Sequence, residues 1–465
     1  MKSLSLYVTV TLSFLLFLSP RVFATSNDDL YKAIISNNVA GVKAAIADGA
    51  DVNKNDVNGN TPLSTAVWNK EILQLLLDAK ADPNKFDNNK VITGLSAAAS
   101  WGEADAIKMM IKAGGNPNIT NKDGYTPLHY ACFNSSSVAA IQALIDGGAD
   151  INAKTSIGLT PFHLYLKEGK TPADKVKQIK SQAPWIEKSG VVLPAYIKNP
   201  EEANFSTPGQ IITYLVSKGV DINEKIVMQL TDADIMALRV SMLGKFTGTR
   251  ASGALEKVLQ KMRDKKIYSY PVLLACEKGK IDAMKVLVEK GANLDVENSV
   301  KANPMWFAAY SGDYEAYKMV KDKVKNNGVN HKDAVGVTVL MAAAMGGNSR
   351  IAEDLLASGA DIDATDQFNA TALHYAAAYN QPEVVTALLN KKADYDIAKK
   401  NIEGMETEGD FNMTSYGFTS YSKTITTYKQ TTPLGIAKIN QEDGKKGDYS
   451  KVIAALEAAG ASKMK

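Results

Sequence analysis

Apolar residues return along this chain in pairs of short clusters, and one pair follows the next after about 33 residues. The first cluster of each pair is a compact run of apolar and small residues, such as Leu95 to Ala99. In the second cluster, apolar residues stand three and four positions apart, as in Ile107, Met110 and Ile111. That spacing places them on one face of a helix. The pattern therefore predicts a series of helix-turn-helix repeats.

The same residue types mark the start and the end of each first helix. Thr126 and Pro127 precede one leucine, because threonine caps free amides and proline pre-sets the first helical turn. An Ala-Ala pair such as Ala98-Ala99 keeps the helix thin, and a glycine such as Gly102 ends it. The leucine-like residue marks successive repeats at Leu30, Leu63, Leu95, Leu128, Phe162, Val272, Met305, Leu340, Leu373 and Leu434.

Two sequence phrases identify the kind of repeat. The motif of residues 126–131 (TPLHYA) returns in shorter form at Thr160 and as TALHYA at Thr371, and a phrase such as Gly148 to Asn152 (GADIN) follows it. The chain thereby resembles the ankyrin-repeat family over most of its length. The resemblance implies an all-α, curved solenoid of about eleven repeats with hairpin-like fingers. It also implies that the histidines hydrogen-bond the turn between neighbouring repeats.

Irregular segments divide the chain. The second repeat lacks two residues just before Glu71, so we expect a tightened helix connection. We predict a signal peptide (1–24), an N-terminal array (25–223) with an insertion (171–207), a degenerate helical repeat or seam (224–268), and a C-terminal array (269–465) with an inserted finger (398–430). The inserted finger is rich in Thr and Tyr, which favours a projecting β-hairpin, with disorder as the alternative.

The N-terminal residues resemble an export signal. Lys2 supplies a positive start, Leu4 to Leu18 is mostly apolar, and Val22 to Ala24 places small residues before a cleavage point. We therefore expect an exported chain, periplasmic in a bacterium or secreted from one. No later segment is apolar for long enough to span a bilayer, so we expect no stable membrane insertion and a monomer.

The charge pattern argues against a nucleic-acid partner, and the positions of the two cysteines argue against a disulfide. The formal net charge is +3 with both signs interspersed, so nucleic acid is not an expected partner. Cys132 and Cys276 occupy equivalent positions in distant repeats, so we expect two small buried hydrophobes and no disulfide. His331 stands in a polar loop, where we expect it to be solvated.

The sequence contains no recognisable catalytic, cofactor-binding or metal-binding motif. No pair of histidines has metal-ligand spacing, and G-x-S-x-G and H-E-x-x-H do not occur. Gly169 to Thr171 resembles the end of a phosphate-binding loop, but Leu164 stands where that loop needs glycine. The finger aspartates recur with the repeat, which indicates that they shape turns: Asp82, Asp150, Asp221, Asp361 and Asp394.

Aromatic residues mark a candidate binding face. The resemblance implies that a partner meets the concave side, at the finger tips and at two variable positions after the Ala-Ala pair. We predict partner-binding residues at Trp68, Trp101, Phe133, Tyr310 and Tyr379, and in the inserted finger at Tyr416, Phe418 and Tyr421. In the alternative, the insertion 171–207 folds back over these rings, or the rings pack on neighbouring helices.

Together these features predict an exported, non-enzymatic protein-protein interaction module. Its partner would be another protein, in the role of a scaffold for an envelope enzyme, an effector or an immunity factor. The alternative is an enzyme, or an accessory enzyme subunit, whose site lies in the two insertions. That alternative requires residues 171–207 and 398–430 to pack together around a pocket.

Overall fold

The computed structural model describes the helical repeats and leaves several connecting segments aside. The described residues are 26–188, 198–203, 205–228, 267–277, 280–321, 323–324, 328–367, 369–396, 432–443 and 447–461. They belong to two compact units, residues 1–221 and 222–465. The predicted signal peptide, most of segment 224–268 and the inserted finger 398–430 lie outside the described residues.

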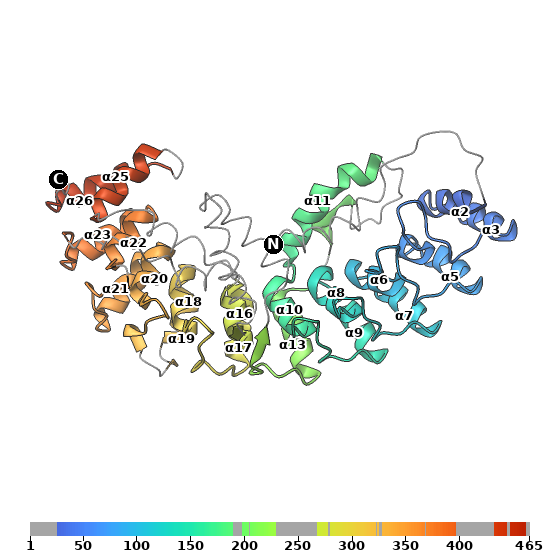
Figure 1. Cartoon of the computed structure of the whole chain (residues 1–465), viewed down its shortest axis with the longest axis horizontal. Coiled ribbons are helices and arrows are strands. Elements are labelled where there is room, and N and C mark those ends of the chain that lie inside the picture. Colours follow the sequence, from blue (N-terminus) through green and yellow to red (C-terminus); the bar gives the residue numbers. More distant parts are fainter. Residues whose placement is uncertain are drawn as a thin grey trace, which may run out of the picture. The chain divides into compact units, whose positions relative to one another are not determined.

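The N-terminal unit is a stack of five described helix pairs (Figure 1). First helices contact first helices of the neighbouring repeats, and second helices contact second helices. The pairs are α2 (Ser26–Ile35) and α3 (Val39–Ala47), α4 (Pro62–Thr65) and α5 (Lys70–Asp78), α6 (Gly94–Trp101) and α7 (Ala104–Lys112), α8 (Pro127–Tyr130) and α9 (Val138–Asp146), and α10 (Pro161–Glu168) and α13 (Pro208–Ser217). Between α10 and α13, the insertion contains α11 (Pro172–Lys188) and the 3₁₀ turn η3 (Pro200–Glu202).

The C-terminal unit likewise contains five described helix pairs. They are α16 (Pro271–Glu277) and α17 (Ile281–Glu289), α18 (Pro304–Ser311) and α19 (Tyr314–Lys321), α20 (Val339–Gly346) and α21 (Ser349–Ala357), α22 (Ala372–Ala378) and α23 (Pro382–Asn390), and α25 (Pro433–Asp443) and α26 (Ser450–Ala458). A 3₁₀ turn, η4 (Gly328–Asn330), precedes α20. The all-α solenoid that the sequence predicts is confirmed.

A short antiparallel ribbon stands at the start of the C-terminal unit. Strand β1 (Ile226–Met228) pairs with β2 (Ile267–Ser269), with Val227 opposite Tyr268. The strands form the two described ends of segment 224–268. The degenerate helical repeat predicted for this segment falls on residues between the strands that lie outside the described ones.

The threonine caps and the small residues act as the sequence predicts. Thr93 Oγ1 accepts a hydrogen bond from Ser96 N at 3.1 Å, and Ala98 and Ala99 behind it are fully buried. Where the array is tightest, even a methyl group is excluded. A Cβ at Gly346 would lie 2.6 Å from the main-chain oxygens of Ala309 and Tyr310, on the neighbouring first helix.

A ladder of side-chain amides joins the fingers. Asn53 Nδ2 donates to a main-chain oxygen of the next finger at 3.1 Å, and its Oδ1 accepts from Asp82 N at 2.7 Å. Asn84 and Asn118 repeat this two-way bridge. The carboxylate of Asp82 accepts from Asn84 N at 2.8 Å, and equivalent turns form at Asp150, Asp361 and Asp394. These bonds explain why amide and acidic residues recur in the fingers.

The histidines support the repeat register. His129 is buried, its Nδ1 lies 2.8 Å from Thr126 Oγ1, and its Nε2 lies 3.0 Å from Leu159 O. Burial lowers the pKa of His129 to about 4, so the ring is neutral at pH 7. The expectation for His331 is wrong, because its ring is buried and its Nε2 lies 2.6 Å from Lys301 O. Stacking of successive fingers buries the His331 ring, which would be exposed if the polar loop stood alone.

Candidate functional site

Two tryptophans on consecutive repeats form the centre of the predicted aromatic row. Trp68 follows the shortened first helix α4, which has 4 residues, whereas Trp101 ends the 8-residue α6. Their ring centroids lie 5.0 Å apart in an edge-to-face arrangement, and both side chains stay partly exposed. The indole nitrogen of Trp68 is buried without a hydrogen-bond partner. The structure thus brings together two of the predicted anchors.

The third predicted anchor, Phe133, lies in an irregular turn. In each repeat, an N-cap residue precedes the first helix and another precedes the second. The chain between these two residues is one residue longer here (Thr126 to Ser137) than in the preceding repeat (Thr93 to Glu103). The extra residue is absorbed by a π-helical turn, η2 (Ala131–Ser135). Phe133 stays partly exposed in this turn.

The insertion and Lys170, the residue just before it, dock on this turn through hydrogen bonds. Lys170 N donates to Phe133 O at 3.2 Å, and Ser136 Oγ donates to Lys170 O at 2.8 Å. Farther along, Ser206 N donates to Ser136 O at 2.8 Å, while its Oγ accepts from Val138 N at 3.0 Å. The insertion therefore satisfies polar groups that the irregular turn leaves outside its own helix. This arrangement matches the alternative in which the insertion folds back over the aromatic row.

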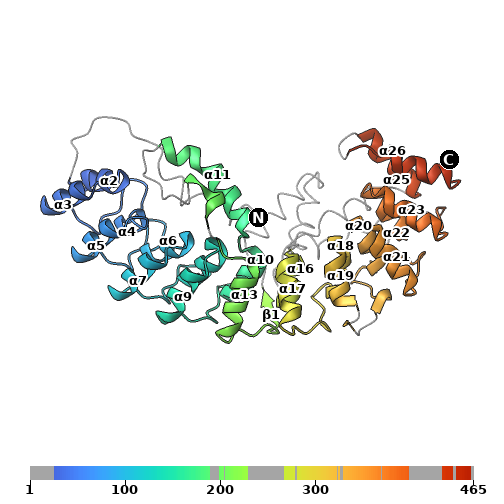
Figure 2. The same cartoon turned by 180° about the vertical axis from the view of Figure 1, so that it is seen from behind.

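Lys175 of α11 ties the insertion to the aromatic row. Its side chain is 1% exposed, its Nζ donates to Asn134 O at 2.8 Å, and it lies 4.9 Å from the ring centroid of Trp101. Burial, followed by repulsion from Lys170, lowers the pKa of Lys175 to about 7, and Glu103 acts in the opposite direction. Both views show α11 on the side of the N-terminal unit where the first helices lie, rising from near α10 (Figures 1 and 2).

The sequence analysis did not identify Lys175 as a site residue. A signal for it exists in the spacing of α11, because Lys175 and Ile179 lie one turn apart and are the buried residues among positions 172–181. The second signal is the extra residue in the loop that receives α11. Each signal is weak alone, since a lysine on a helix is usually solvated.

In the C-terminal unit, two predicted anchors occupy regular repeats. Tyr310 is partly exposed and stacks on the fully buried Trp306, with ring centroids 5.5 Å apart. Tyr379 is also partly exposed. Trp306 Nε1 donates to Val337 O at 3.2 Å, which fixes the ring beneath Tyr310. The remaining predicted anchors, Tyr416, Phe418 and Tyr421, lie outside the described residues.

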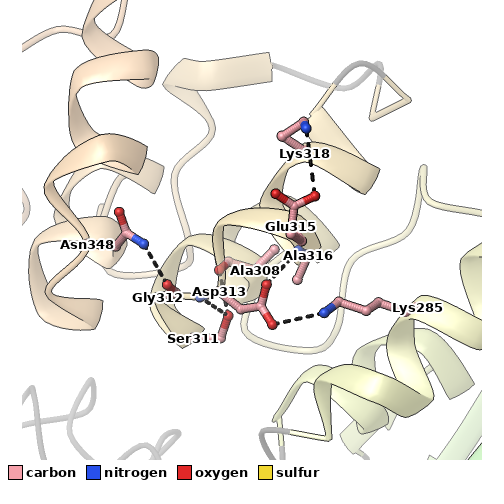
Figure 3. A network of polar contacts seen from close by, with 9 residues as sticks. All are labelled: Lys285, Ala308, Ser311, Gly312, Asp313, Glu315, Ala316, Lys318 and Asn348. Carbon is pink, nitrogen blue, oxygen red and sulfur yellow. Dashed lines mark hydrogen bonds and ion pairs between the residues drawn. The ribbon is translucent and has the colours of Figure 1, made fainter.

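A polar network holds the loop after Tyr310 (Figure 3). Asp313 caps α19 by accepting from Ala316 N at 2.9 Å, and its other oxygen lies 3.1 Å from Lys285 Nζ on α17. Asn348, from the following repeat, donates to Gly312 O at 2.8 Å. Burial would raise the pKa of Asp313, but its hydrogen bonds and Lys285 lower the pKa overall. The network positions the loop through contacts with the repeats on both sides.

The described residues contain little that could perform bond-making chemistry. They hold no cluster of three or more His, Cys, Asp or Glu side chains fit for a metal ion. Cys132 is buried, which raises the pKa of its thiol, and Cys276 is also buried; neither forms a disulfide. Helices long and apolar enough to cross a membrane are absent from the part of the chain that the structure describes.

Comparison with known proteins places these repeats in one family. The family model described as ankyrin repeats (3 copies) matches residues 14–87, 88–177 and 305–400, more than half of the chain. An ankyrin repeat protein of fowlpox virus (strain NVSL) is 34% identical over 110 residues, which cover 23% of this chain and 76% of the viral protein.

Two much longer proteins match over shorter parts of their length. Transient receptor potential cation channel subfamily A member 1 of Homo sapiens is 29% identical over 112 residues, 24% of this chain and 10% of the channel. Neurogenic locus notch homolog protein 1 of Xenopus laevis is 28% identical over 130 residues, 28% of this chain and 5% of the notch protein. The similarity to both is confined to a fraction of each protein. By its helix pairs, its caps and these matches, the chain belongs to the ankyrin-repeat family.

Proposed function

We propose that this chain is an exported, non-enzymatic ankyrin array that binds another protein through the aromatic row Trp68, Trp101 and Phe133. The observation that carries the proposal is the edge-to-face contact of Trp68 and Trp101, which keeps two large rings partly exposed on consecutive repeats. Large aromatic side chains at the edge of a surface are typical anchors of protein interfaces. Ankyrin arrays as a family act by binding proteins, which supports the same assignment.

Partner recognition would depend on shape and apolar contact more than on net charge. Several exposed ion pairs of this unit lie between second helices, as for Lys43 with Glu71 and Lys70 with Asp105. Exposed pairs of this kind contribute little to affinity or stability. The aromatic rings instead offer area that a partner can bury. Tyr310 and Tyr379 provide a smaller second surface of the same type in the C-terminal unit.

The proposed location is outside the cytoplasm, in a bacterial periplasm or in the medium, and the proposed state is a monomer. The apolar run from Leu4 to Leu18 and the small residues Val22 to Ala24 support export. Fractionation followed by intact-mass analysis tests this directly. The exported chain is expected to begin at Thr25, and a chain that stays in the cytoplasm with its first residues intact would rule out export.

The binding proposal is tested by affinity capture from the envelope fraction with three forms of the chain. The wild type is compared with Trp68→Ala/Trp101→Ala/Phe133→Ala and with the control Lys43→Ala/Glu71→Ala, which removes an exposed ion pair between second helices of the same unit. We expect one specific protein to be captured by the wild type and the control but lost from the triple variant. Thermal unfolding by circular dichroism checks that the triple variant stays folded. Capture that is equal for all three forms would remove the aromatic row as the binding site.

A further inference from the structure

Over the part whose side chains the structure describes, helix α11 buries little apolar surface against the N-terminal unit. Of its residues 172–181, Lys175 and Ile179 are buried and the rest are partly or fully exposed. By contrast, α13 buries Ile211, Ile212 and Leu215 within a similar length. Apolar burial is the main source of docking energy for an amphipathic helix. One buried isoleucine is therefore a weak apolar anchor for residues 172–181 of this helix.

The second buried group, Lys175, weakens the docking further. An ammonium group loses its hydration when it is buried, and a single carbonyl and one aromatic face replace that hydration only in part. Two other charged groups act on it, with Lys170 repelling the charge and Glu103 attracting it. When α11 moves away, Lys175 returns to water, where it is fully charged at neutral pH. The docked position is thus disfavoured under conditions that charge this lysine.

The docked helix and Lys170, two residues before it, lie over rings that the binding proposal requires. Lys175 lies over the Trp101 ring at 4.9 Å, and Lys170 lies over the Phe133 ring at 5.9 Å. A partner that inserts a side chain against these faces meets the two lysines first. Among the described residues, hydrogen bonds also join the insertion to the π-helical turn, and the Lys180–Glu201 pair lies inside the insertion.

We propose that α11 is a displaceable cover over Trp101 and Phe133, loosened by the charge of Lys175, so that a partner reaches these rings only after α11 has moved away. This inference rests on the proposed function, because it concerns access to the same aromatic row. It adds a competition within the chain, in which the insertion and the partner occupy one surface in turn. The affinity for a partner would then be reduced by the fraction of molecules in which the cover is closed.

The cover responds to pH in a defined direction. The pKa of Lys175 is about 7 when α11 is docked and about 10.4 when the lysine is free in water. Docking is therefore strongest above pH 10 and weakens as the pH falls, since the open form takes up a proton first. The open fraction is expected to grow about tenfold between pH 9 and pH 8, by less between pH 8 and pH 7, and little below pH 7.

The test is made on the full chain without any partner. Hydrogen exchange, corrected for the intrinsic pH dependence, follows the amides of α11 and α9, and hydroxyl-radical footprinting follows the Trp101 side chain. Wild type is compared with Lys175→Met, with Ile179→Ala and with the matched control Lys177→Met, which alters an exposed lysine of the same helix.

We expect the amides of α11 to exchange at least tenfold faster than those of α9 in the wild type, with the pH dependence given above. Lys175→Met should slow α11 exchange at pH 7 at least tenfold, remove its pH dependence and protect Trp101. Ile179→Ala should have the opposite effect on both readouts, and Lys177→Met should match the wild type. Each of these results supports the cover.

Two results would overturn it. In the first, α11 and α9 exchange together in the wild type, so that the insertion opens only when the whole unit unfolds. In the second, Lys175→Met opens α11, which would make the lysine a net anchor. Because no partner is present, either result leaves the binding proposal standing. Conversely, a failed capture experiment would not change the exchange of α11.

Discussion

The loops after α18 and after α8 each follow a first helix, but one belongs to a regular repeat and the other to an irregular one, and different residues hold them in place. After α18, Ser311 to Asp313 are held by residues of the adjoining repeats, with Lys285 on one side and Asn348 on the other. After α8, one extra residue opens a π-helical turn, and the insertion supplies the partners of that turn. The first loop is completed by the repeats themselves, and the second depends on a segment that is not part of any repeat.

This difference matters because the two kinds of attachment have different reversibility. Contacts between repeats are lost only when the array separates, because each repeat stabilises its neighbours. Contacts with an insertion can be lost while the array stays intact, since local opening needs only the free energy of that segment. The loop after α8 is therefore the place where a folded array can expose new surface. The loop after α18 offers no such freedom.

The largest expected effect comes from disrupting the close packing of first helices in the regular repeats. Gly346→Ala places a Cβ 2.6 Å from the main-chain oxygens of Ala309 and Tyr310, and neither backbone atom can move aside cheaply. We expect the free energy of unfolding of the C-terminal unit to fall by about 3 kcal/mol. Urea unfolding measures the change. Gly359→Ala is the control, because its Cβ meets nothing within 4 Å and its φ of 87° should cost about 1 kcal/mol. Equal losses at both sites would contradict the close approach of the two helices.

The next effect converts the irregular loop into a regular one. Deleting Ser136 restores the spacing of the preceding repeat and removes a residue with φ of 50°. It also removes the hydroxyl that donates to Lys170 O and the carbonyl that accepts from Ser206 N. We expect the array to stay helical by circular dichroism while α11 amides exchange at least about tenfold faster. Unchanged exchange of α11 would show that the π-helical turn does not hold the insertion.

Much of the fold follows from residues that are visible in the sequence. Leu30, Leu63, Leu95 and Leu128 were assigned to the starts of first helices, and each is buried in the structure. Caps, Ala-Ala pairs and finger amides repeat at fixed spacing, so each position is supported by all the others. The pairing of β1 with β2 was missed, because two three-residue strands carry too short a pattern to detect.

The candidate site was predictable only in part. The nearness of Trp68 and Trp101 follows from their places among the variable positions of consecutive repeats, but the sequence left open whether the insertion covers them. Burial of Lys175 depends on the carbonyl oxygen of Asn134 and on the register of α11. Main-chain acceptors have no signature in a sequence, because every residue carries one. The structure is needed to show that an extra residue turns such an acceptor toward a lysine.

A smaller effect tests the polar network after α18. Asp313→Ala removes the cap of α19 and the partner of Lys285, and we expect the free energy of unfolding to fall by about 1 kcal/mol. Asp313→Asn keeps an oxygen for the cap and should cost only about 0.3 kcal/mol. Urea unfolding at pH 7 separates the two variants. If Asn proves as costly as Ala, the charge of Asp313, and not its capping oxygen, stabilises the loop.

The smallest effect concerns the ion pair itself. Lys285 and Asp313 are about one third exposed, so Lys285→Met should lower the free energy of unfolding by about 0.3 kcal/mol in low salt and by less in 0.5 M salt. The pKa of Asp313 lies below its usual value, so its carboxylate stabilises the fold at neutral pH, and this contribution disappears as the pH falls through the folded pKa, below about 3.9. The difference between wild type and Lys285→Met should therefore shrink in acid, whereas the Lys175→Met effect on α11 falls as the pH rises above 7. Opposite pH responses at the two loops would show that the Lys285–Asp313 pair stabilises the array, whereas the buried charge of Lys175 destabilises the docking of α11. A difference for Lys285→Met that stays constant down to pH 3 would mean that packing of its aliphatic chain, and not the pair with Asp313, holds the regular loop.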